Sequence, residues 1–223
     1  MNLGSPRVHL RLVDSTNERA RALAARGAPS GTLVTAREQS AGRGRQGRTW
    51  TAPPGRALLC SLLLRDPPRL LPLAAGVAVA EVVGDRARVK WPNDVLLDER
   101  KVAGILVEGR PQERWAVLGI GLNVAVRETD LPPELRGRAG TLGLSVDDVE
   151  PALRRLLERL ERWLAAAPDT ILDALRERDA LLGRPVRWGG GAGEAAGVDG
   201  DGRLVVVTGN GQVALEAGEV HLG

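Results

Sequence analysis

The pattern of hydrophobic and polar positions changes near residue 183. Before it, apolar runs of strand length alternate with segments whose leucines recur at helical spacing. After it, short runs rich in Val and Gly are separated by turn signals such as Asp199-Gly200-Asp201-Gly202. We therefore expect an α+β domain with a mixed β-sheet and flanking helices over residues 1–182. A small β-barrel of about five strands should follow over residues 183–223.

Each element is predicted from its local pattern and from the residues that end it. Helices are expected at 18–26, 70–83, 149–166 and 170–182. Strands are expected at 32–36, 57–64, 88–91, 95–97, 102–108 and 115–120, and in the barrel at 185–188, 194–198, 204–207, 213–215 and 219–222. Residues 37–56 contain Gly, Pro and Arg without an apolar period, which predicts a long loop.

The composition is that of a globular protein, with 43% hydrophobic and 26% charged residues in 223. Phe and Tyr are absent, so Leu, Val, Ala and Ile must build the core together with five Trp. A net charge of +3 gives little support to a function that wraps nucleic acid. The single Cys60 excludes an intramolecular disulfide and fits a reducing compartment. Without a leader or a membrane-length apolar run, we expect a cytoplasmic protein.

Lysine is rare in this chain: of the 31 basic residues only Lys90 and Lys101 are lysines, and both lie in the segment 90–101. The compact ammonium group of lysine concentrates its charge on one point, and it fits positions that the planar guanidinium group of arginine cannot occupy. Asn93 and Asp94 lie between them, at the expected mouth of two strands. This set suits an anionic ligand together with a divalent metal, with Asp94 as the partner of the metal or of a hydroxyl group. Chance clustering, or a hairpin turn in which Lys101 pairs with Asp98 or Glu99, is the alternative.

The loop segment 42–50 places three arginines among three glycines. Glycines let the backbone approach a ligand, and backbone N–H groups with guanidinium groups can bind carboxylate or phosphate. The alternatives are a solvated loop or a segment that contacts RNA. We expect the loop to be ordered only once a ligand offsets its charge.

Two expected strands carry glycine inside otherwise bulky runs, at Gly104 and at Gly119 and Gly121. A glycine inside a strand indicates that a ligand or another backbone comes close, which here would form a slot for a flat apolar molecule. A bulge or tight helix packing is the alternative.

Together these segments resemble the biotin–protein ligases, in the order and approximate spacing of that family. The resemblance rests on DSTN at 14–17, QSAGRGRQGRTW at 39–50, KWPND at 90–94, KVAGILVE at 101–108 and GIGLNV at 119–124, and it extends through the C-terminal segment. It implies a catalytic domain similar to class II aminoacyl-tRNA synthetases and a C-terminal SH3-like barrel. It also implies two reaction steps: biotin and MgATP give biotinyl-5′-AMP, which then biotinylates a lysine of a biotin carboxyl carrier protein or domain.

The resemblance also implies residue roles in biotin binding. Ser15, Thr16 and Gln39 would hydrogen-bond the ureido ring of biotin. The backbone at Gly42 and Arg43 would close over it. Gly104 and Gly119 would line its slot.

Further roles concern the adenylate and catalysis. Arg45 and Arg48 would steady the adenylate and pyrophosphate, and Lys101 would bind the biotin carboxylate and then the transition state. The remaining nucleotide contacts would come from Trp50, Lys90, Asn93, Asp94 and Asn123. Asp94 would be the Mg²⁺ ligand.

Two rival functions stay open at this stage. A lipoate–protein ligase would use the same adenylation on another acid, but it would have no use for a polar set that suits a ureido ring. A nucleic-acid-binding protein would use the arginine–glycine loop and the barrel. Because only 13 residues precede Asp14, we expect a monofunctional ligase that does not bind DNA. A sheet edge offers a possible homodimer surface.

Overall fold

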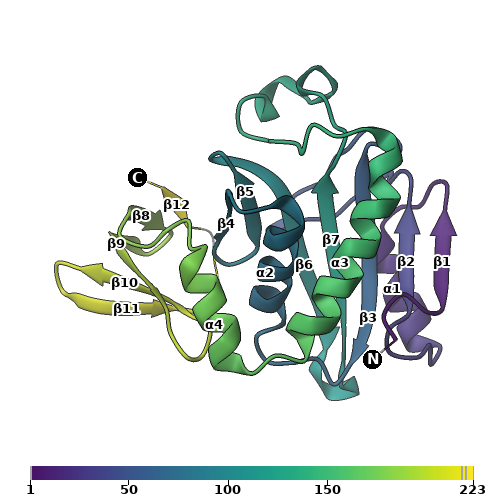
Figure 1. Ribbon diagram of the computed structural model, residues 1–223. Helices are drawn as coiled ribbons and strands as arrows, with labels where there is room; N and C mark the ends of the chain where they lie inside the picture. The colour runs from purple at the N-terminus through teal and green to yellow at the C-terminus, as the bar shows by residue number, and fades with distance from the viewer. Residues whose placement is uncertain (1, 217, 219, 223) are drawn as a thin grey trace.

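The computed structural model describes residues 2–216, 218 and 220–222. Two β-sheets dominate it, a larger one near the N-terminus and a smaller one at the C-terminal end (Figure 1). Four helices cover the larger sheet and the junction between the two.

The larger sheet has seven strands in the order β1-β2-β3-β7-β6-β5-β4. The strands are β1 (Arg7–Leu10), β2 (Leu33–Ala36), β3 (Ala57–Arg65), β4 (Ala87–Lys90), β5 (Asp94–Leu97), β6 (Arg100–Arg110) and β7 (Trp115–Asn123). Strand β1 runs parallel to β2 and every other pairing is antiparallel, so the sheet is mixed as expected.

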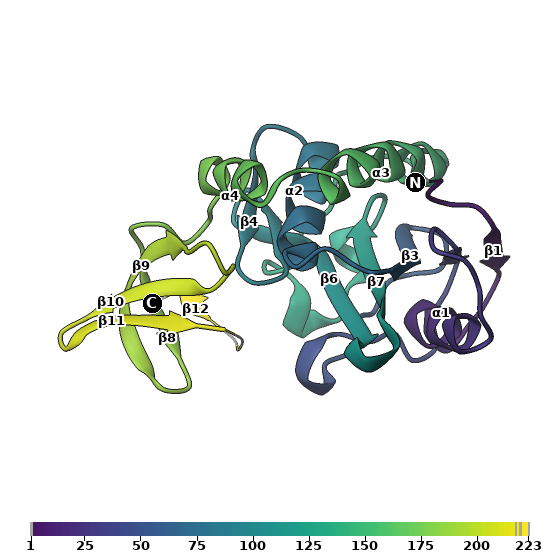
Figure 2. The same ribbon diagram turned by 90° about the horizontal axis from the view of Figure 1, so that it is seen from below.

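Helices pack on both faces of this sheet. They are α1 (Thr16–Ala25), α2 (Leu71–Val83), α3 (Val149–Leu164) and α4 (Pro168–Glu177). Figure 2 shows α2, α3 and α4 on one side of the sheet and α1 on the other. The alternation of β3 explains this, because Leu62 and Leu64 face the core that contains α2 and α3 while Leu63 packs with Ala20 and Ala24 of α1.

The smaller sheet has five antiparallel strands in the order β11-β10-β9-β8-β12. They are β8 (Pro185–Trp188), β9 (Gly191–Val198), β10 (Leu204–Thr208), β11 (Gly211–Leu215) and β12 (His221–Leu222). The buried Trp91 ties the two sheets together, because its indole Nε1–H donates to the Gly202 carbonyl at 3.0 Å. Arg184 also pairs with Glu99 at 3.0 Å.

Three sequence predictions differ from the structure. The helix expected at 170–182 begins at Pro168 and ends at Glu177, because the following residues form main-chain hydrogen bonds with Val89 of β4 instead. Strand β1 was not predicted; it is only four residues long. Of the strand expected at 219–222, only His221–Leu222 is a strand; Val220 is not, and Glu219 lies outside the described residues.

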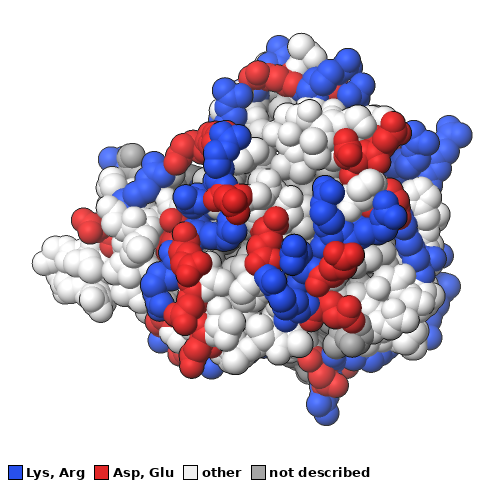
Figure 3. Space-filling view, in the orientation of Figure 1, with Lys and Arg blue, Asp and Glu red and all other residues white. Residues whose placement is uncertain are grey.

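Positive and negative side chains are interspersed on the face shown in Figure 3, which has no continuous basic field. The β10–β11 hairpin, over residues 204–215, carries neither sign. Within the described residues, no helix combines the length and apolarity needed to cross a membrane.

Candidate active site

A cavity of about 720 Å³ brings most of the sequence motifs together. Its wall comes from the start of α1, the loop before β3, the β4–β5 turn, strands β6 and β7, the segment 131–139 and the C-terminal strand β12. This volume lies in the range of small-molecule sites. Fifteen residues were expected to form the site, and all except Gly42 line the cavity.

The glycines of β6 and β7 form the floor of this cavity. Gly104 and Gly121 are direct partners across the two strands. A Cβ at Gly104 would lie 3.0 Å from Cζ3 of Trp50, and a Cβ at Gly121 would collide with the same indole. A Cβ at Gly119 would collide with the side-chain amide of Asn17. The glycines therefore make room for Trp50 and Asn17 of the chain itself, a detail that the expected slot for a flat molecule did not include.

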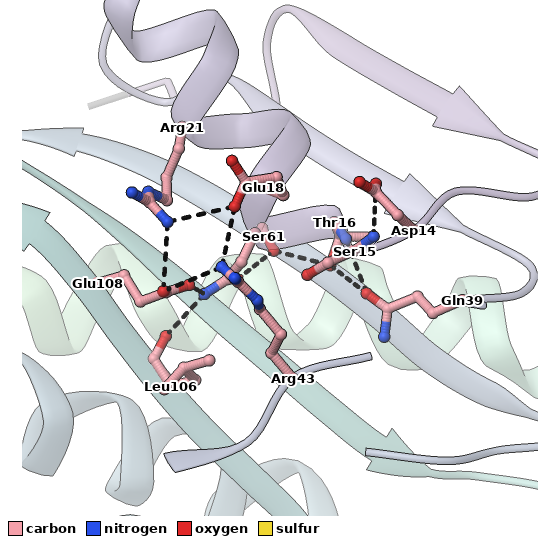
Figure 4. Close-up of polar contacts among 11 residues, drawn as sticks. Asp14, Ser15, Thr16, Glu18, Arg21, Gln39, Arg43, Ser61, Leu106 and Glu108 are labelled. Carbon is pink, nitrogen blue, oxygen red and sulfur yellow. Dashed lines mark hydrogen bonds and ion pairs between the residues drawn. The ribbon is translucent and has the colours of Figure 1, made fainter. Parts of the chain in front are cut away.

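Polar groups of Ser15, Thr16 and Gln39 line the cavity beside these glycines, at the N-terminus of α1 (Figure 4). We call this set the polar wall. Gln39 Oε1 accepts the Thr16 backbone N–H at 2.7 Å and lies 3.0 Å from Thr16 Oγ1. The backbone N–H of Ser15 donates to Asp14 Oδ1 at 2.7 Å, and Ser15 is buried. Gly42 does not line the cavity but packs against Gln39, because a Cβ at this position would lie 2.8 Å from Gln39 Nε2.

Two further residues belong to this wall and were not predicted. Ser61 Oγ lies 2.8 Å from Thr16 Oγ1 and 2.6 Å from Asn17 Oδ1, and both Ser61 and Asn17 are buried. The signal for Ser61 was available, since it is the one hydroxyl in the apolar run of β3. Asn17 belongs to the DSTN motif, but no role was predicted for its side chain.

The arginine–glycine loop has several anchors in the structure. Arg45 donates to Asn93 Oδ1 at 3.0 Å, and Arg43 pairs with Glu18 at 2.9 Å. Trp50 packs against a small apolar cluster that contains Leu59 of β3. Trp50 thus gives the loop an apolar contact that the sequence pattern did not indicate. Ordering of the loop by a ligand stays a prediction.

Lys101 lies at the centre of the site. Its Nζ is 2.6 Å from Oδ1 of Asp94 and 5.8 Å from the centroid of the Trp50 ring. The sheet fixes this pair, because Asp94 is the register partner of Gly104 on β6.

The alternative of a surface ion pair at Lys101 was wrong. Asp98 pairs instead with Arg86 at 2.9 Å, and Glu99 pairs with Arg184. Lys101 is therefore directed toward the cavity rather than along the hairpin.

The other expected cations surround Lys101. Burial lowers the pKa of Lys90, an effect opposed by Asp94 and strengthened by Lys101, Arg48 and Arg138. Burial also lowers the pKa of Arg45, which nevertheless stays charged. Arg138 was not predicted; it lines the cavity, and its carbonyl accepts the backbone N–H of Lys101 at 2.9 Å. A cavity that concentrates so much positive charge is suited to an anion.

Asn123, the last residue of β7, also lines the cavity. Its Nδ2 donates to the Gly140 carbonyl at 2.9 Å, while its buried Oδ1 has no hydrogen-bond partner within the described part of the chain. An unsatisfied buried acceptor costs on the order of 1–3 kcal/mol. Asn123 Oδ1 is therefore available to accept a hydrogen bond from a ligand.

The described residues do not form a multi-ligand metal site. No group of three or more His, Cys, Asp and Glu side chains among them could hold an ion. Asp94, the expected metal ligand, is already paired with Lys101. The site therefore fits a metal that arrives with phosphate ligands, because Mg²⁺ commonly binds through one or two carboxylates and substrate phosphates.

Three residues without an expected role have clear positions. Cys60 is buried in the core, and burial raises the pKa of its thiol to about 12. The Nδ1 of His9 is 2.9 Å from Oγ1 of Thr35, outside the cavity. His221 of β12 lines the cavity, which the sequence did not indicate.

Comparison with known proteins agrees with this geometry. Residues 9–124 match the model of the biotin/lipoate A/B protein ligase family, and residues 181–223 match the biotin protein ligase C-terminal domain. The biotin–[acetyl-CoA-carboxylase] ligase of Mycobacterium tuberculosis is 37% identical over 93% of this chain and 86% of its own length. The bifunctional ligase/repressor BirA of Bacillus subtilis is 34% identical over 99% of this chain and 75% of its own length.

A solved structure is similar over almost the whole chain. The biotin protein ligase from Aquifex aeolicus in complex with biotin and ATP has a TM-score of 0.81 at 30% identity, covering 98% of this chain and 99% of that one. The fold and site define an adenylate-forming type of ligase. The chain belongs to the biotin/lipoate A/B protein ligase family and carries the C-terminal domain of its biotin protein ligases.

Proposed function

We propose that this protein is an ATP-dependent biotin–protein ligase that forms biotinyl-5′-AMP and transfers the biotinyl group to a lysine of a carrier domain. One observation supports this above all. The polar wall at Thr16 and Gln39 and the ammonium of Lys101 open into the same cavity. Such a cavity suits a ligand with a hydrogen-bonding head and a carboxylate end.

The head of biotin would lie against the polar wall. Its ureido ring offers two N–H donors and one carbonyl acceptor, which Ser15, Thr16 and Gln39 can match. The backbone at Gly42 and Arg43 would pass over the ring, and Gly104 and Gly119 would bound its slot. The buried position of this wall favours a ligand that satisfies it, because unpaired polar groups are costly in a dry site.

The first reaction step forms the mixed anhydride. An oxygen of the biotin carboxylate attacks the α-phosphorus of ATP, a new P–O bond forms, and the bond to pyrophosphate breaks. Lys101 would neutralise the carboxylate and then the charge on the phosphorus-bound oxygens. Arg45, Arg48 and Lys90 would hold the phosphates and the leaving pyrophosphate. Catalysis would rest on positioning and on electrostatic stabilisation.

The second step transfers the biotinyl group. The neutral amine of the carrier lysine attacks the carbonyl carbon of biotinyl-5′-AMP, an amide forms, and AMP leaves as the amine loses a proton. The same cations that bound the phosphates would stabilise the departing AMP.

The nucleotide would be held by the remaining cavity residues. The unsatisfied Oδ1 of Asn123 suits the exocyclic amino group of adenine. Trp50 supplies an aromatic face, and Asn93 and Asp94 suit the ribose and the Mg²⁺ that accompanies ATP as a substrate complex. The cytoplasmic location and the possible homodimer stay predictions.

The two rivals are less well supported. A lipoyl chain has no hydrogen-bonding head for the buried wall at Thr16 and Gln39. The interspersed charges of Figure 3 do not form the basic stripe expected of a nucleic-acid-binding face.

The test is to incubate the protein with biotin, MgATP and a biotin carboxyl carrier domain, and to measure the mass of the carrier. A gain of one biotinyl group is expected, and none when lipoate replaces biotin. A carrier of unchanged mass with biotin, or an equal gain with lipoate, would overturn the proposal.

A further inference from the structure

A hydrogen-bonded relay connects the polar wall to a cluster of four charged residues, Glu18, Arg21, Arg43 and Glu108 (Figure 4). Glu108 of β6 lies at the junction: its Oε2 accepts from Asn17 Nδ2 at 2.8 Å, and its Oε1 lies 3.5 Å from Arg43 and 3.6 Å from Arg21. Glu18 contacts the same two arginines at 2.9 and 3.2 Å. Two arginines and two glutamates thus alternate around a ring, but only Glu108 also contacts the wall.

The charge of Glu108 fixes the orientation of Asn17. A carboxylate only accepts hydrogen bonds, so the amide must present Nδ2 to it. The Leu106 carbonyl, 3.4 Å from the same Nδ2, favours this orientation too. Asn17 Oδ1 is therefore directed at Ser61, which must donate its single hydroxyl proton across the 2.6 Å contact.

The direction of this bond determines what Thr16 can do. With the Ser61 proton committed to Asn17, the Thr16 hydroxyl must donate either to Ser61 Oγ at 2.8 Å or to Gln39 Oε1 at 3.0 Å. In both cases the hydroxyl protons of Ser61 and Thr16 are used within the protein. The Thr16 hydroxyl then offers a lone pair, which accepts a hydrogen bond from an N–H group, while the Gln39 amide N–H groups and the Ser15 hydroxyl are not fixed by this relay.

We propose that Glu108 is a positioning residue for ligand selection: acting through Asn17 and Ser61, it keeps the Thr16 hydroxyl of the polar wall in an accepting state that selects ligands with an N–H donor at this position. This inference rests on the proposed biotin site and explains how that site favours a ureido ring. Gly119 is part of the device, because only glycine leaves room for the Asn17 amide.

A glutamine at position 108 would weaken this selection. Its amide can donate as well as accept, so Asn17 is free to turn and present Nδ2 to Ser61. The Ser61 proton would then point toward Thr16 or the ligand, and the wall would present donors and acceptors in a mixture. Glu18→Gln is the matched control, because it removes the same charge from the same arginine pair without contacting Asn17.

The experiment measures binding of biotin, and of a biotin analogue methylated on one ureido nitrogen, by calorimetry. We expect Glu108→Gln to weaken biotin binding about tenfold and to narrow the preference of the wild type for biotin over the analogue. Glu18→Gln should keep that preference and bind biotin within about twofold of the wild type. Glu108→Asp keeps a carboxylate, which only accepts hydrogen bonds, so this variant should keep the wild-type preference for biotin over the analogue.

Equal weakening of both ligands by Glu108→Gln, or an unchanged preference, would overturn the inference, since a purely structural role predicts one of these. Should Glu108→Gln not fold, Asn17→Ala gives the same test, because it removes the acceptor that holds the Ser61 proton and lets Ser61 donate to Thr16 instead. A narrowed preference supports the inference and an unchanged one overturns it. A wild type that binds no biotin would instead overturn the proposed function, before any variant is compared.

Discussion

Lys101 Nζ lies 2.6 Å from Asp94 Oδ1; the two residues come from neighbouring strands of the sheet, and both line the cavity. The ammonium therefore has a fixed position beside a carboxylate. An incoming biotin carboxylate or phosphate would compete with Asp94 for the same Nζ. We therefore expect Asp94 to position Lys101, a role that the sequence had not indicated.

The first prediction concerns this pair. Asp94→Asn removes the charge that positions Lys101, and we expect biotinyl-5′-AMP formation to slow about tenfold. Asp98→Asn is the matched control, because it breaks the exposed pair with Arg86 on the same hairpin and should leave the rate unchanged. Single-turnover kinetics of adenylate formation measures both. Equal rates of adenylate formation for Asp94→Asn and the wild type would contradict the positioning of Lys101 by Asp94.

A second prediction concerns the floor of the cavity. A methyl group at Gly121 would displace the Trp50 indole, so Gly121→Ala should destabilise the protein by about 1–3 kcal/mol and weaken ATP binding. Gly200→Ala is the control, because a Cβ there meets nothing within 4 Å. Its free energy of unfolding should stay within about 0.5 kcal/mol of the wild type. Urea denaturation and nucleotide titration provide the measurements, and equal stability of the two variants would contradict the assigned contact.

A third prediction concerns Lys90, whose buried charge is expected to bind phosphate but to lower the stability of the folded protein. Its pKa is lowered mainly by burial, so the unfolded chain binds this proton more tightly than the folded protein does. Stability should therefore rise as the pH increases from the folded pKa toward the ordinary pKa of lysine. Lys90→Met should raise the melting temperature at neutral pH, lose this pH slope and weaken ATP binding. A lower melting temperature for the variant would refute the argument.

The fourth prediction concerns Cys60. Burial raises the pKa of this thiol to about 12, while the unfolded thiol ionises near its ordinary value of 9.0. The folded protein binds this proton more tightly, so stability should fall as the pH rises above that ordinary value. At pH 8, iodoacetamide should modify Cys60 only after denaturation. Rapid labelling of the native protein, measured by mass spectrometry, would contradict its position in the core.

Much of this site could be predicted because its motifs are continuous in sequence. The segments around Lys101 and Arg45 each combine charge with glycine or a strand end, and such local patterns indicate chemistry without knowledge of the fold. The same holds for the long elements, since α3 has leucines at helical spacing and β3 is a continuous apolar run.

The remainder depends on contacts between distant segments. Asn17, Ser61 and Glu108 lie on three elements, and only the folded sheet brings them into one relay. Arg138 comes from a loop without any motif. The end of α4 was mispredicted for the same reason, because the residues after Glu177 pair with β4 rather than extend the helix.

The most direct test of the account is a single-turnover measurement of biotinyl-5′-AMP formed from biotin and MgATP, by wild type and by Lys101→Ala. The wild type should form the adenylate with biotin and not with lipoate. The variant should fold normally and react roughly 10- to 150-fold more slowly, the equivalent of the ~1.5–3 kcal/mol of a hydrogen bond to a charged group. A variant that forms the adenylate at the normal rate, or a wild type that forms none, would contradict the account.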